Sequence, residues 1–188
     1  MAKRASRRKR LPRRIKKLPR RELLGVLIFL VKFNLLALPM YAVMYSGISL
    51  PWLQQAIADF LYATLKAAGY AVAKQGIVLT LVAGNAITNI IIDMDCTGWK
   101  SMYAVAALAL ATPAPNDWKK LKFIAAGASA LFALNLLRVF TTIVVAYEVG
   151  FGYLDIVHTL LWREGLIIAV LAIWYLWLRN LRLAKHKK

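Results

Sequence analysis

Cysteine, histidine and acidic residues are all scarce in this chain of 188 residues, and each scarcity excludes a class of site. Cys96 is the only cysteine, so the chain forms no internal disulfide and no multi-cysteine metal centre. Of its two histidines, one lies in the basic C-terminal tail, which argues against a zinc site. The sequence therefore predicts a protein that uses neither a metal nor another cofactor.

Acidic residues are outnumbered by basic ones, 8 to 26, which gives a formal net charge of +18. The longest basic run lies between Lys3 and Arg21 and contains no acid, and smaller clusters occupy 119–122 and 179–188. All three flank apolar segments, as the positive-inside bias requires. Such clusters also attract anionic lipid headgroups, by about 1 kcal/mol per charge. No aromatic residues interleave with the N-terminal charges, so membrane orientation is favoured over the alternative of RNA binding, and no nucleic-acid partner is expected.

Apolar residues make up 61% of the chain, and its mean hydropathy is +0.58. These values are typical of a multi-pass membrane protein. The sequence predicts a membrane all-α fold with about four transmembrane helices in a bundle, an extracytoplasmic interfacial helix and a small β-hairpin. A single integral-membrane domain, 23–180, would lie between a basic cytoplasmic arm, 1–22, and a basic cytoplasmic tail, 181–188.

Four apolar stretches are long enough to be read as spans, and two further segments have other patterns. The predicted spans are 23–46, 97–112, 121–147 and 156–179. Residues 51–73 show amphipathic helical spacing and are expected to lie at the outer interface. Two β-branched runs flank a Gly-Asn turn within 76–93, which predicts a hairpin standing outside the bilayer or against other protein.

An even number of spans places both basic termini in the cytoplasm. Six spans, with 50–73 and 76–92 both crossing, satisfy the same rule, so it stays open whether 50–92 crosses the membrane. Either path puts Cys96 on the extracytoplasmic side of a multi-pass cell-membrane protein.

The four-span path brings three reactive side chains to one leaflet: Cys96 at the outer mouth of a span, Arg138 within the next and His158 near the start of the last. Burying a guanidinium within a membrane costs roughly 2.5–3.5 kcal/mol, so Arg138 is predicted to have a functional role. Asn135 precedes Arg138 by three residues and is expected to share its hydrogen-bond network. Asp155 bears the same relation to His158, as a cap or as a carboxylate that orients the ring.

These side chains suggest cysteine-dependent acyl transfer. A thiolate at Cys96, favoured by a helix N-terminus and a nearby cation, would attack a carbonyl and form a thioester. Arg138 would stabilise the tetrahedral oxyanion. His158 would carry the proton to the leaving amine and later take one from the incoming nucleophile.

Three motifs in this order, Cys96-Thr-Gly-x-x-Ser101, Asn135-x-x-Arg138 and a helix-start His158, resemble the exosortase/archaeosortase family of membrane transpeptidases. The resemblance is closest to compact archaeosortase-like members. It implies a catalytic set of Cys96 as nucleophile, Arg138 as transition-state stabiliser and His158 as acid/base partner. It also implies the substrates: secreted or surface proteins that end in a short recognition motif, a transmembrane helix and a basic tail. Such proteins would be cut near the motif and passed to an acceptor, plausibly a lipid.

The resemblance covers roughly 76–165, and the motif departs from the usual family pattern at Asp95 and at Trp99-Lys100, which replace a more usual apolar pair. Asp95 stands directly before the cysteine, where the family often has a small residue, and it would oppose ionisation of the thiol unless Lys100 or Arg138 offsets its charge.

A non-catalytic membrane protein is the alternative. An assembly factor or transporter subunit could use Arg138 only as a structural ion pair, with Asp155 or Glu148 as the carboxylate.

Overall fold

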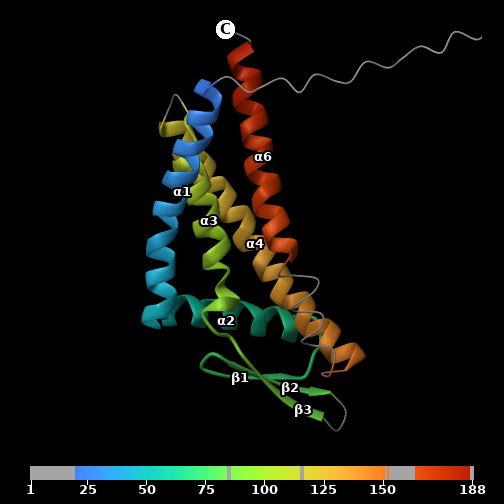
Figure 1. Ribbon diagram of the computed structural model, residues 1–188. Helices are drawn as coiled ribbons and strands as arrows, with labels where there is room; N and C mark the ends of the chain where they lie inside the picture. The colour runs from blue at the N-terminus through green and yellow to red at the C-terminus, as the bar shows by residue number, and fades with distance from the viewer. Residues whose placement is uncertain (1–19, 84–85, 115–116, 151, 153–163, 187–188) are drawn as a thin grey trace, which may run out of the picture.

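Helices stand above a small antiparallel sheet in the computed structural model, which describes residues 20–83, 86–114, 117–150, 152 and 164–186 (Figure 1). The helices α1, α3, α4 and α6 run roughly along one direction, while α2 crosses beneath α1 and α3 and separates them from the sheet. In chain order the elements are α1 (Arg20–Ser46), α2 (Pro51–Ala67), β1 (Val72–Gln75), β2 (Val78–Ala83), β3 (Ala86–Ile91), the short 3-10 helix η1 (Asp95–Thr97), α3 (Trp99–Ala111), α4 (Asp117–Val149) and α6 (Glu164–His186).

Within the described part of the chain, three helices are long and apolar enough to cross a membrane: Glu22–Ser46, Asp117–Val149 and Glu164–Leu181. The mostly helical membrane architecture is thereby confirmed. The helix α3 has 13 residues and a length of about 20 Å, which is short of the roughly 30 Å hydrocarbon layer. The predicted fourth span at 97–112 therefore stays a prediction.

The helices α4, α6 and α2 have other ends than the sequence predicts. The helix α4 extends beyond 121–147 at both ends. The start predicted for the last span, at 156, lies outside the described residues, and α6 continues to His186, past the predicted end at 179. No glycine or proline interrupts 179–186, and the cations there suit the C-terminal end of a helix dipole. The basic tail predicted at 181–188 thus begins as helix.

The amphipathic helix predicted at 51–73 ends earlier, at Ala67. Pro51 fits its first turn, where no backbone N–H is required. Gly69 ends it with a φ of +89°, and the N–H of Tyr70 donates to the carbonyl of Leu65. The last two residues of the predicted helix, Val72 and Ala73, instead begin β1, a strand that was not predicted from the sequence.

The predicted hairpin is confirmed as β2 and β3, and β1 extends it into a sheet of order β1-β2-β3. Thr80 pairs with Asn89 at its centre, and the Thr80 hydroxyl lies 2.8 Å from the Asn89 side-chain oxygen. Alternate residues point to opposite faces, so Leu79 and Leu81 of β2 face α2 and are fully buried.

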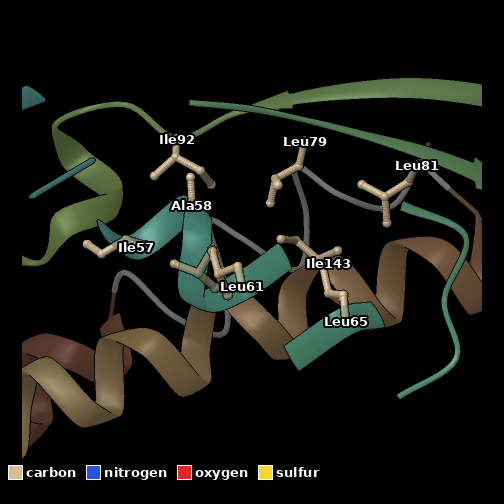
Figure 2. Close-up of a cluster of buried hydrophobic side chains, with 9 residues drawn as sticks. Ile57, Ala58, Leu61, Leu65, Leu79, Leu81, Ile92 and Ile143 are labelled. Atoms are coloured by element: carbon tan, nitrogen blue, oxygen red, sulfur yellow. The ribbon is translucent and has the colours of Figure 1, made fainter. Parts of the chain in front are cut away.

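The main apolar core lies between α2, the sheet and α4 (Figure 2). Its members on α2 recur along one face at helical spacing, and they contact the residues of the sheet that point toward α2. The buried cluster contains Ile57, Ala58, Leu61, Leu65, Leu79, Leu81, Ile92, Val139 and Ile143. Because Cys96 packs against this cluster, the core also fixes the position of the only thiol.

Truncating this core should loosen the sheet. Leu61 is 0% exposed, so Leu61→Ala is expected to cost roughly 2–5 kcal/mol and to lower the midpoint of thermal unfolding in detergent. Phe60→Ala, at the neighbouring position that is 49% exposed, is the matched control. Equal shifts for the two variants would show that α2 does not rest on the sheet in solution.

Candidate functional site

The site is built on the turn that joins β3 to α3. The side chain of Gln54 in α2 donates from Nε2 to the carbonyl of Ile92 at 3.1 Å and so fixes the end of the strand. The Cys96 N–H then donates to Oδ1 of Asp93 at 2.9 Å. Thr97, fully buried, donates from Oγ1 to the carbonyl of Met94 at 2.7 Å. The thiol-bearing turn is thus held at both ends by side chains.

Gly98 follows with a φ of +72°, a conformation that favours glycine. A Cβ at this position would lie 2.7 Å from Cγ of Asn135, so the absence of a side chain also lets α4 approach the turn. The Ser101 hydroxyl donates to the carbonyl of Gly98 at 2.7 Å and supports the first turn of α3. The Cys-Thr-Gly-x-x-Ser pattern therefore has a backbone explanation for each of its residues after the cysteine.

Asn135 joins the turn to α4. Its Nδ2 donates to the carbonyl of Cys96 at 2.7 Å, and its Oδ1 accepts from Nη1 of Arg138 at 3.3 Å. Asn135 is 0% exposed and Arg138 is buried as well. One amide therefore contacts both the cysteine residue and the guanidinium, and the structure brings Cys96, Asn135 and Arg138 together.

Asp95 forms an ion pair with Lys100 of α3. Its Oδ1 lies 2.7 Å from Nζ of Lys100 in a partly exposed ion pair. Lys100 thus offsets the negative charge of Asp95, as considered from the sequence. The carboxylate that acts on the thiol is instead Asp93, which the sequence analysis missed. The sequence feature that could have identified Asp93 is its place three residues before the cysteine, a spacing at which an Asp or Asn side chain accepts a backbone N–H.

The Cys96 pKa is raised to about 12, first by burial of the thiol and then by its hydrogen bond to Asp93 and the charge of that carboxylate. The positive charge of Arg138 lowers this pKa but does not offset the other effects. The raised pKa disfavours the thiolate expected from the sequence. The reason is structural: Cys96 lies three residues before Trp99, the first residue of α3, and packs against the apolar core, so the N-terminus of α3 does not act on it directly.

His158 and Asp155 lie outside the described residues, so their places in the site stay predictions. The alternative ion pair between Arg138 and Glu148 fits poorly. Both belong to the continuous helix α4, ten residues apart, which is a rise of about 15 Å. Glu148 lies instead beside Tyr70, whose pKa is raised by desolvation first and by Glu148 second.

The comparison with known families agrees with the resemblance noted in the sequence. Residues 20–178 match the transmembrane exosortase family. The chain belongs to this family. The match extends well beyond the stretch that carried the motif resemblance and includes α1, α2 and most of α6. No curated protein and no solved structure matched the chain. Membership in the exosortase family, together with the apolar helices, makes this a membrane protein.

The acidity of Cys96 should respond to Asp93 and not to Asp95. The alkylation rate with iodoacetamide is expected to keep rising above pH 9, because the thiol pKa is about 12. Asp93→Asn removes a carboxylate that raises this pKa, so the profile should shift to lower pH and alkylation at pH 8 should accelerate. Burial would still hold the pKa above that of a free thiol.

Asp95→Asn is the matched control, since Lys100 already pairs with that carboxylate. An unshifted profile in Asp93→Asn, or an equal shift in both variants, would contradict the contact between Asp93 and the thiol.

Proposed function

We propose that this exosortase-family protein is a cysteine transpeptidase that removes C-terminal sorting signals from secreted proteins and transfers the shortened proteins to an acceptor, a membrane lipid. The observation that carries the proposal is the Asn135 amide, whose two ends contact the Cys96 carbonyl and the Arg138 guanidinium. A partly buried thiol residue near a buried cation, in a membrane protein of this family, suits thioester chemistry at a peptide carbonyl.

The first half of the reaction breaks the peptide bond. Because the resting cysteine is a thiol, a base must take its proton as sulfur attacks the substrate carbonyl carbon, and we assign this role to His158. Arg138 would stabilise the oxyanion that forms. Collapse then breaks the C–N bond, and His158 returns the proton to the leaving amine. The released fragment is the substrate's transmembrane helix with its basic tail.

The second half forms the new bond. A hydroxyl or amine of the acceptor gives its proton to His158 and attacks the thioester carbonyl. The C–S bond breaks, and the sulfur regains the proton as a thiol. We propose that Asp155 orients the imidazole in both halves, while Asn135 and Ser101 position Arg138 and the turn that bears Cys96.

The effect of Asp93 on the thiol would suit a cysteine that faces the extracytoplasmic side. A protonated, partly buried thiol reacts slowly with oxidants and stray electrophiles. The sulfur would become nucleophilic only when a base and a bound carbonyl are both in place, so the raised pKa protects the thiol between turnovers.

The proposed orientation places the reaction on the extracytoplasmic side. In Figure 1 the start of α1 and the end of α6 lie at one end of the helices, and the sheet lies at the other. The basic arm and tail would hold the first end at the cytoplasmic, anionic leaflet. Cys96 joins the sheet to α3 and would then face the side where secreted substrates emerge.

Replacing the sulfur tests the function. Cys96→Ser and Cys96→Ala should each abolish processing of host proteins that end in an apolar helix and a basic tail, so that the unprocessed forms accumulate on gels. Membrane levels of the variants, measured by immunoblot, control for folding. Normal processing with either variant would overturn the proposal.

Replacing the guanidinium tests its role. Arg138→Lys keeps the charge but loses the planar fork of donors, so processing should slow by about 10²–10³-fold, the range found when one oxyanion donor is removed. Thermal unfolding in detergent separates this loss from misfolding. Wild-type processing by a stably folded Arg138→Lys protein would show that only the positive charge of Arg138 is needed, and not its planar fork of donors.

A further inference from the structure

The open edge of β3 is the feature that the reaction chemistry does not explain. Within the described residues β3 pairs only with β2, so its other side is an edge of the sheet. The N–H of Ile92 donates to the carbonyl of Ile77, which fixes the alternation of the ladder. Ile87, Asn89 and Ile91 therefore direct their backbone N–H and C=O groups toward the open edge.

The two edges of this sheet differ in how they are protected. β1 is only four residues long, and its Lys74 pairs with Asp59 of α2 at 2.7 Å. β3 has six residues with no charge and no proline, and Ile87 and Ile91 are 70% and 60% exposed. Proteins normally blunt such an edge with charges, prolines or bulges, because it templates pairing with another strand. Within the described residues, the edge of β3 carries neither a charge nor a proline of this kind.

Chain continuity connects this edge to the proposed active site. β3 ends at Ile91, Gln54 holds the carbonyl of the next residue, and Cys96 follows four residues later. A peptide extended along β3 would therefore be led to the thiol. No comparable connection exists for β1, whose ends join α2 and β2.

We propose that β3 is the substrate-binding edge: the segment of the secreted protein that precedes its transmembrane helix adds to β3 as an extra strand. This inference rests on the proposed function. Strand addition uses backbone hydrogen bonds for affinity and leaves alternate side chains to be recognised, which suits a family of substrates that share only a short motif. The substrate runs toward the membrane and β3 runs toward Cys96, so the added strand is parallel to β3.

Cysteine cross-linking tests the edge, since Cys96→Ala alone gives a cysteine-free protein that should also leave its substrate uncut. Ile87→Cys and Ile91→Cys are placed in this background. The probe is a host protein ending in an apolar helix and basic tail, with single cysteines scanned over the residues before that helix. Disulfides formed on mild oxidation should appear at every second probe position. The best probe position for Ile87→Cys should lie four residues before the one for Ile91→Cys.

Val82→Cys is the matched control. Val82 lies opposite Ile87 on the central strand and is 40% exposed, so it shares the sheet surface but not the edge. Equal cross-linking from Val82→Cys, or a pattern without alternation and register, would overturn the proposal. Cross-links between two copies of this chain would assign the edge to a dimer and overturn it as well.

Proline substitution gives a second test in the otherwise unchanged protein. Ile91→Pro removes an edge-facing N–H without removing a bond to β2, so processing should slow by roughly five- to tenfold. Ile91→Val keeps that N–H and should process normally. If Cys96→Ala stops processing while Ile91→Pro does not slow it, the edge proposal alone fails. If Cys96→Ala leaves processing intact, the proposed function fails first.

Discussion

The buried amide of Asn135 is the interaction on which the site depends. A side-chain amide removed from water must satisfy both its donor and its acceptor, or it costs the protein about 1–3 kcal/mol per missing bond. Asn135 meets this demand from two directions, through the Cys96 carbonyl and the Arg138 guanidinium. These two bonds hold the turn in a fixed position against α4. Gly98 makes the close approach of the turn and α4 possible, because any side chain there would collide with the amide.

The helix α2 supplies the rigid support for this contact. One face of it packs against the sheet, and α4 closes the same core through Val139 and Ile143. Val139 directly follows Arg138 in the sequence, so the packing that stabilises the fold also limits how the guanidinium can move. Gln54, on the same helix, holds the strand that leads to the thiol. Core and site therefore share their supporting residues, and neither can be repacked independently.

Patterns that depend on neighbouring residues were readable from the sequence, and contacts across the fold were not. The hairpin followed from β-branched runs around a turn, and the long apolar helices followed from hydropathy. β1 was missed because Val72–Gln75 is short and carries Lys74, and only pairing with β2 makes it a strand. The structure brings together Cys96, Asn135 and Arg138, the residues that the first two motifs single out. The role of Asp93 was missed, because it depends on how the turn folds the carboxylate back onto Cys96.

Charge balance around Cys96 constrains the order of any reaction there. Asp93 and Arg138 act on the Cys96 pKa in opposite directions, with Asp93 the stronger, and Asp95 pairs with Lys100. A thiolate, or an oxyanion on a bound carbonyl, would add a negative charge beside Asp93, whose effect on the thiol Arg138 does not offset. Loss of the thiol proton and arrival of the carbonyl must therefore be coupled, with the proton retained nearby as positive charge. An imidazole supplies such a carrier near neutral pH. A substrate held along β3 would bring its carbonyl into place before the proton moves, which makes strand addition and proton transfer successive parts of one activation step.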